Sequence, residues 1–92
     1  MKIVCNGTVI GESSDVIIEG RECYFPESDV RMQFLSKNSE VLYCPDKGYG
    51  VNYDICGEGN TVHGSAWGYP HPYPKSAALK GRIGFKLALV VE

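Results

Sequence analysis

Turn signals divide this chain into short extended segments, and the pair Asn6-Gly7 constrains the fold most. It stands between Lys2-Ile3-Val4-Cys5 and Thr8-Val9-Ile10. Both residues of the pair tolerate a positive φ, and the β-branched residues on either side favour strands, so the pair predicts a tight hairpin. The chain is therefore predicted to open with two antiparallel strands.

The rest of the chain repeats this alternation of short strands and turns. Strands are expected over residues 16–19, 22–25, 41–43, 51–56, 62–67 and 82–91. Their β-branched and aromatic residues favour extended chain, and residues 82–91 are apolar enough to pass through the middle of a sheet. A single turn is expected near Glu27–Asp29 and a hairpin loop over Gly57–Asn60. The pattern predicts a mostly β fold of about eight antiparallel strands.

One short helix is expected near residues 75–80. The segment Lys75-Ser76-Ala77-Ala78-Leu79-Lys80 contains good helix formers, and Gly81 follows it as a suitable C′ residue. Prolines and tyrosines fill most of the Tyr69–Pro74 segment before it. Because proline fixes φ and restricts the residue before it, this segment is predicted to be a stiff, extended loop.

Length and composition narrow the class of protein. A chain of 92 residues with 43% hydrophobic content predicts one domain over residues 1–92 with a single modest core. No apolar run is long enough to cross a bilayer, so no membrane partner is expected. A net charge of −2 with scattered Lys and Arg argues against a nucleic-acid partner. Without a recognisable signal peptide, the chain is expected to be cytoplasmic, as a monomer or homodimer.

The cysteines Cys5, Cys23, Cys44 and Cys56 raise the question of a zinc site or of disulfides. No C-x-x-C pair is present, although this spacing is usual in structural zinc sites. Free buried thiols are the simpler expectation for such a chain. We therefore expect no metal and no other cofactor.

Two segments contain residues that strands do not require. Tyr43-Cys44-Pro45-Asp46-Lys47-Gly48 places a thiol, a proline and an ammonium in one tight turn. About twenty residues later, Ala66-Trp67-Gly68-Tyr69-Pro70 contains the only tryptophan. We expect the two segments to face each other across a shallow site.

Five short motifs follow one another in a fixed order along the chain. They are Asn6–Ser13, Tyr24-Phe25-Pro26 with Asp29-Val30-Arg31, Cys44-Pro45-x-Lys47-Gly48, Ala66-Trp67-x-Tyr69-Pro70-x-Pro72, and Leu79-Lys80-Gly81 with Phe85. In this order they resemble the domain-of-unknown-function family 427 over nearly the whole chain. The resemblance implies a single compact antiparallel β domain of the β-tent type. It implies no function, because fold alone does not confer one.

The first hypothesis for the site is the binding of a small anionic or aromatic ligand. Lys47 and the backbone amides around Gly48 would hold an anion. Tyr53, Trp67 and Tyr69 would provide a stacking surface for a ring. The competing interpretation is a solvated lysine beside an aromatic cluster that seals a small core.

A second hypothesis is a cysteine-dependent enzyme with Cys44 as nucleophile. Lys47 would activate it by lowering the pKa of the thiol, because only a thiolate is a useful nucleophile. The competing interpretation is that Cys44 packs as a small hydrophobe and that Pro45–Gly48 is simply a good turn. Folding would have to bring His63 or His71 near the thiol to supply a base.

A third hypothesis makes the Tyr69–Pro74 loop a protein–protein interaction module. Its tyrosines and prolines would offer a rigid surface to a partner or to a second copy of the chain. The competing interpretation is that the prolines only stiffen a long crossing loop.

Overall fold

Antiparallel hairpins build most of the computed structural model, which describes residues 1–57 and 60–91. Its strands are β1 (Lys2–Cys5), β2 (Thr8–Glu12), β3 (Ile17–Glu19), β4 (Glu22–Pro26), β5 (Leu35–Lys37), β6 (Leu42–Cys44), β7 (Gly48–Gly57), β8 (Asn60–Gly68), β9 (Arg82–Lys86) and β10 (Val90–Val91). Four 3₁₀ segments accompany them: η1 (Glu27–Asp29), η2 (Met32–Phe34), η3 (Pro74–Leu79) and η4 (Leu87–Leu89). The predicted mostly β, antiparallel class is confirmed, and the described residues hold ten strands where about eight were predicted.

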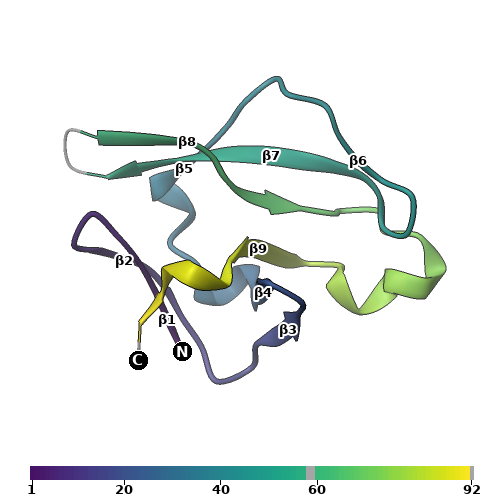
Figure 1. The fold of residues 1–92 in the computed structure, drawn as a ribbon, viewed down its shortest axis with the longest axis horizontal. Coiled ribbons are helices and arrows are strands. Elements are labelled where there is room, and N and C mark those ends of the chain that lie inside the picture. Colours follow the sequence, from purple (N-terminus) through teal and green to yellow (C-terminus); the bar gives the residue numbers. More distant parts are fainter. Residues whose placement is uncertain (58–59, 92) are drawn as a thin grey trace.

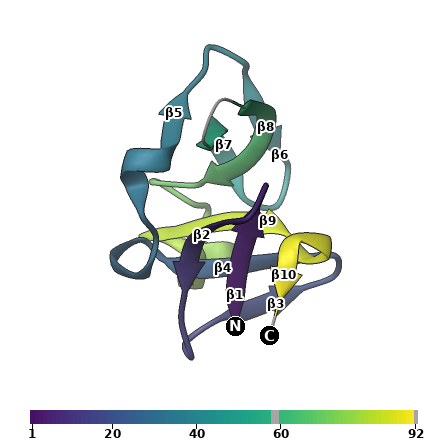
Figure 2. The same cartoon turned by 90° about the vertical axis from the view of Figure 1, so that its left-hand side faces the viewer.

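The strands form a small sheet and a large one. The three-stranded sheet has the order β10-β1-β2, and the seven-stranded sheet has the order β3-β4-β9-β8-β7-β5, with β6 paired to β7 (Figure 1). The small sheet lies against the part of the large sheet that contains β4 and β9 (Figure 2). The two chain ends lie close together because β1 pairs with β10, with Lys2 opposite Val91. Between them the sheets enclose most of the apolar side chains.

The first hairpin forms as the Asn-Gly pair predicts. Asn6 has φ 50° and Gly7 has φ 80°, so both adopt the left-handed region that a two-residue type I′ turn requires. The turn joins β1 to β2 with Cys5 opposite Thr8. The turn expected near residues 27–29 also forms, as η1. The expected loop over residues 57–60 includes positions 58 and 59, which lie outside the described residues.

The prediction of one continuous strand over residues 82–91 is wrong. Strand β9 ends at Lys86, η4 follows, and β10 then pairs with β1 in the other sheet. The amide of Leu87 donates to the carbonyl of Arg21 at 2.8 Å, which turns the chain away from the large sheet. The apolar run therefore serves two sheets, and its Leu87, Leu89 and Val90 pack against the core between them.

The helix expected near residues 75–80 is present as the 3₁₀ segment η3, and it is kinked at Ser76 (φ −120°). The Ser76 hydroxyl donates to the carbonyl of Asp46 at 3.1 Å, and the Ser76 amide donates to the carbonyl of Tyr73 at 2.8 Å. These bonds compete with the α-helical pattern, because serine readily satisfies backbone groups outside a helix. No helix in the described part of the chain is long and apolar enough to span a membrane.

The two faces of the large sheet carry different side chains. The first, which we call the core face, presents fully buried Phe25 and Phe85, whose ring centroids lie 5.8 Å apart in a T-shaped arrangement. Its core also includes Ile3, Cys5, Ile10, Cys23, Val30, Tyr53, Ile55, Ala66 and Ile83. The alternate residues of the same strands form the second, or aromatic, face, where Tyr24 and Trp67 both lie opposite Gly84 in the strand register. Tyr24, Tyr69 and Leu79 form the buried centre of a cluster there.

Candidate functional site

The Cys44–Gly48 turn contacts the chain that follows the Trp67–Pro70 bend. The Tyr73 amide donates to the carbonyl of Lys47 at 3.0 Å, and the Lys75 ammonium contacts Asp46 at 2.9 Å. Cys44, Trp67 and Tyr69 all pack in the cluster on the aromatic face. The strand order brings them together, since β6 pairs with β7 and β7 with β8.

Within the turn, other side chains of the protein already contact both Lys47 and Gly48. The Lys47 ammonium contacts Glu19 of β3 at 3.0 Å, and only 14% of its side chain is exposed. The hydrogen bond with Glu19 is the main reason that the pKa of Lys47 is raised, so the lysine stays charged. Gly48 has φ 97°, and the ring of Tyr73 would lie 3.2 Å from any Cβ built there. The Tyr73 ring therefore packs against Gly48, around which an anion was predicted to bind.

Two cavities lie beside the cluster on the aromatic face. Three of the six predicted site residues line one or the other of them, and the other three belong to the Cys44–Gly48 turn. Trp67 lines the first cavity, whereas Tyr53 and Tyr69 line the second. Cys44, Lys47 and Gly48 line neither of these two. Tyr53 belongs to the core cluster and Tyr69 to the cluster on the aromatic face, although both line the second cavity.

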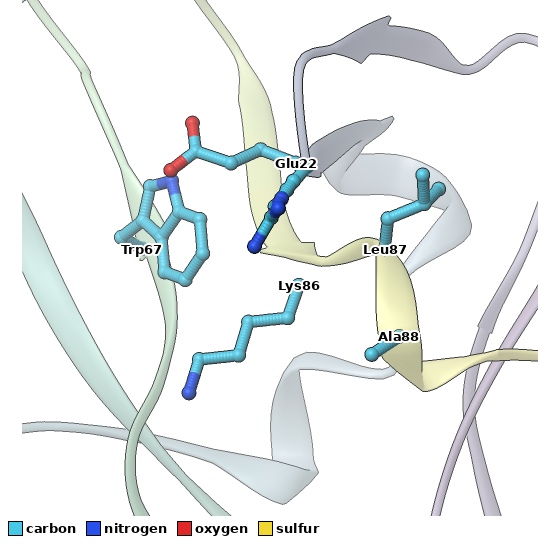
Figure 3. Close-up of a pocket in the computed structure, with 6 residues that line it drawn as sticks. Glu22, Trp67, Lys86, Leu87 and Ala88 are labelled. Carbon is cyan, nitrogen blue, oxygen red and sulfur yellow. The ribbon is translucent and has the colours of Figure 1, made fainter.

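The first cavity, which we call the indole cavity, has a volume of about 590 Å³. It is lined by Arg21, Glu22, Trp67, Lys86, Leu87 and Ala88. Figure 3 shows the indole of Trp67 across the cavity from Leu87 and Ala88, with the Lys86 side chain extending between them toward the tryptophan side. The volume lies within the range of small-molecule pockets.

A hydrogen-bonded chain fixes the indole at one side of this cavity. The indole N–H of Trp67 donates to the Tyr24 hydroxyl at 3.2 Å, and that hydroxyl donates to Glu22 at 2.8 Å. Burial raises the pKa of Tyr24, so the phenol stays protonated and remains a donor to the carboxylate. We call these two hydrogen bonds the Trp67–Tyr24–Glu22 relay. Only one carboxylate oxygen of Glu22 takes part in it, and the second oxygen does not.

Gly84 allows the relay to form directly over β9. A Cβ built at Gly84 would lie 2.4 Å from the indole nitrogen of Trp67 and 2.7 Å from a ring carbon of Tyr24. No real side chain tolerates such contacts, so one of the two rings would have to move. The glycine therefore lets Trp67 of β8 reach Tyr24 of β4 across the strand between them.

The charges around the indole cavity are unevenly balanced. Two cations, Arg21 and Lys86, line it together with one carboxylate, Glu22. In the part of the chain that the structure describes, neither cation forms an ion pair. Their charges are therefore available to a negatively charged group that enters beside the indole.

Of the two histidines considered as a base for Cys44, His63 is held by Glu40 and Asp54, at 2.9 Å from each carboxylate. The thiol of Cys44 is half-buried against the aromatic cluster. The enzyme hypothesis for Cys44 and Lys47 stays a prediction.

All four cysteines are free, and Cys5 and Cys23 are buried. The Cys23 thiol donates to the carbonyl of Phe85 at 3.6 Å, and burial raises its pKa to about 11. Such a thiol stays protonated and inert near neutral pH. Within residues 1–57 and 60–91, no three His, Cys, Asp or Glu side chains are grouped closely enough to hold a metal ion.

The proposed interaction loop is only partly exposed. Tyr69 is buried in the cluster, whereas Tyr73 is 38% exposed. Beside it lie the exposed rings of Tyr43 and Tyr49, 4.7 Å apart between centroids. The interaction hypothesis for the Tyr69–Pro74 loop also stays a prediction.

Sequence reasoning did not identify the partners of Trp67. Glu22 and Tyr24 alternate on β4 and thus share one face, and the glycine in Ile83-Gly84-Phe85 marks a close approach within a strand. Both the alternation on β4 and the glycine within β9 can be seen in the sequence. Their connection to Trp67 depends on the strand order β4-β9-β8, which local patterns do not specify.

Comparison with known proteins gives one finding about the chain as a whole. The model of a family described as a domain of unknown function (DUF427) matches residues 1–91. No curated protein matches the chain. The match covers both sheets and every residue that lines the indole cavity.

Proposed function

The chain belongs to this domain-of-unknown-function family, DUF427, and we propose that it binds a small aromatic anion in the indole cavity. One observation carries the proposal: the cavity sets an anchored indole beside two cations that have no acidic partner among the described residues. A flat ring gains contact area and favourable stacking against the indole. A carboxylate or phosphate on that ring would pair with Arg21 and Lys86.

The proposal retains one residue of the sequence hypothesis and replaces another. Trp67 keeps its role as the stacking surface. Arg21 and Lys86 replace Lys47 as the proposed anion-binding residues, because the Lys47 ammonium already pairs with Glu19 at 3.0 Å. The ligand thus lies on the Trp67 side of the cluster and not in the Cys44–Gly48 turn itself.

Glu22 adds a requirement for the ligand. One of its oxygens accepts the Tyr24 hydroxyl, and its carboxylate lies beside the indole (Figure 3). A ligand group that donates a hydrogen bond would satisfy the remaining oxygen, whereas a second anionic group would be repelled. The best ligand is therefore a ring with one acidic group and one donor, as in 4-hydroxybenzoate.

Intrinsic fluorescence tests the proposal directly, because Trp67 is the only tryptophan. We expect benzoate, phenyl phosphate and 4-hydroxybenzoate to change the emission in a saturable way, and neutral benzyl alcohol to act much more weakly. Arg21→Gln and Lys86→Gln should each weaken benzoate binding roughly three- to tenfold. Lys75→Gln is the matched control, because Lys75 lines neither cavity.

Two results would contradict the proposal. The first is equal binding of benzoate and benzyl alcohol, which would show that the cations do not recognise the acidic group. The second is a benzoate affinity that Arg21→Gln and Lys86→Gln leave at the level of Lys75→Gln.

A further inference from the structure

The second cavity lies where the bend after Trp67 meets the start of β9, and it has a volume of about 350 Å³. Its lining includes three cationic side chains and a single carboxylate, together with Tyr53 and Tyr69. The cations are Lys37, Lys80 and Arg82, and the carboxylate is Glu27. We call this hollow the lysine cavity. It shares no lining residue with the indole cavity.

Two of the three cations are available to a ligand. The Arg82 guanidinium pairs with the carboxylate of Asp15 at 3.1 Å and donates to the carbonyl of Tyr24 at 3.3 Å. Lys37 and Lys80, by contrast, are exposed, and neither forms an ion pair with any residue that the structure describes. The cavity thus presents two uncommitted ammonium groups from separate elements.

Tyr53 supplies a hydrogen-bond donor directly beside one of these cations. Lys37 of β5 lies opposite Tyr53 of β7 in the strand register, so the two side chains emerge next to each other on the same face. Tyr53 is only 9% exposed, and its hydroxyl has no hydrogen-bond partner among the described residues.

The hydroxyl of Tyr53 is not sealed from solvent, because no buried side-chain nitrogen or oxygen in the described residues lacks a hydrogen-bond partner. Tyr53 is also one of the residues that line the lysine cavity. A nearly buried donor that faces a hollow without a partner is a group that a ligand can satisfy. Burial also raises the pKa of Tyr53, which keeps the phenol protonated.

Backbone contacts hold the Lys80 part of the cavity in place. Lys80 follows η3 and precedes Gly81, whose φ of 75° makes the tight turn into β9. The carbonyl of Gly81 accepts the amide of Glu27 at 2.9 Å, which ties η1 to this turn. Lys80 is therefore presented from a fixed turn and not from a free loop.

From this arrangement we propose that the lysine cavity binds a small oxyanion, a carboxylate or a phosphate. Lys37 and Lys80 supply the positive charge, and the Tyr53 hydroxyl donates a hydrogen bond to one of the anion's oxygens. Glu27 limits the charge that the site accepts, because a bulky polyanion would be forced against it. The site is separate from the one proposed for the aromatic anion.

Thermal unfolding at constant ionic strength tests this site with two probes, inorganic phosphate and succinate. A ligand that prefers the native state raises the melting temperature with its concentration, so each titration yields an affinity. We expect Lys37→Gln and Lys80→Gln each to weaken binding of the recognised probe roughly three- to tenfold. Tyr53→Phe keeps the ring and removes only the donor, and it should weaken binding roughly two- to tenfold.

Phosphate also stabilises proteins without a site, because it is excluded from their surfaces. The double variant Lys37→Gln with Lys80→Gln measures that background, and Lys75→Gln controls for the loss of a lysine elsewhere. A probe-dependent shift that is lost in the double variant and kept in Lys75→Gln supports the site, and the probe that gives it identifies phosphate or carboxylate. Shifts of the same size in wild type and in the double variant, for both probes, would overturn the proposal.

Discussion

The two faces of the large sheet use the same strands for different purposes. On the core face, Phe25 and Phe85 meet edge to face and are fully buried, with no polar atom in their side chains. On the aromatic face, Tyr24, which is next to Phe25 on β4, meets Trp67 of β8 through a hydrogen bond that continues to a carboxylate. The comparison shows that packing between buried apolar rings stabilises one face. On the other face, hydrogen bonds hold Tyr24 and Trp67 in position, and Trp67 at the same time lines the indole cavity.

The largest expected effect is on the core face. Phe85→Ala removes a fully buried ring and leaves a cavity beside Phe25, so it should lower the free energy of unfolding by about 3–5 kcal/mol. Urea denaturation followed by circular dichroism measures the loss. A loss below about 1 kcal/mol would mean that this face is not the main source of stability.

The next largest effect is expected on the aromatic face at Gly84. Gly84→Ala inserts a Cβ where the indole of Trp67 and the ring of Tyr24 now lie, and should cost about 1–3 kcal/mol while changing the tryptophan emission. Gly68→Ala is the matched control on the neighbouring strand, because its nearest contacts would be 3.3 Å and longer. Equal losses for the two variants would contradict the idea that Gly84 specifically makes room for the relay.

A smaller effect should follow from breaking the relay without changing its shape. Tyr24→Phe keeps the ring and removes the hydroxyl that accepts from Trp67 and donates to Glu22, so it should cost about 1 kcal/mol. A double-mutant cycle with Glu22→Gln measures how much of this loss belongs to their contact. Additive losses in the cycle would show that the hydroxyl and the carboxylate do not act together.

The smallest effect is expected where exposed His63 contacts the carboxylates of Glu40 and Asp54. Glu40, through its hydrogen bond, and then Asp54 raise the pKa of His63 above its ordinary value of about 6.5. The folded state therefore binds this proton more tightly than the unfolded state. The resulting stabilisation is fully present below about pH 6.5 and is lost as the pH rises through the higher folded pKa.

Urea midpoints measured across this pH window test the His63 prediction. His63→Gln should flatten the dependence of the midpoint on pH. Because the His63 side chain is 62% exposed, the change should be small and should shrink further at high salt. A wild-type midpoint that rises with pH through this window would contradict the sign.

The parts of the fold that depend on neighbouring residues could be predicted from the sequence. Asn6-Gly7 specifies its own turn, and the alternation after Val51 specifies a strand whichever strands lie beside it. The break after Lys86 could not be predicted, because it depends on a bond between Leu87 and Arg21 that joins distant parts of the chain. The apolar run there fits one long strand equally well.

The candidate site shows the same division. The expectation that the Cys44–Gly48 turn faces the Trp67–Pro70 bend could be formed from the sequence, because β6, β7 and β8 follow one another and pair as hairpins. The partner of Lys47 was not predicted, since Glu19 lies on β3 at the far edge of the sheet order. Such a contact joins strands that are far apart in the sheet order, so it depends on the three-dimensional shape of the sheet and not on any local sequence pattern.

Trp67, Gly68 and Tyr69 are consecutive, yet Trp67 borders one hollow and Gly68 and Tyr69 border the other. Any displacement of this short segment when one ligand binds must also alter the walls of the second hollow. Thermodynamics then requires reciprocity: the factor by which phosphate changes the affinity for benzoate equals the factor by which benzoate changes the affinity for phosphate. Four titrations, of each ligand with and without the other, give the four affinities of this thermodynamic cycle. Together they measure the coupling free energy between the two cavities.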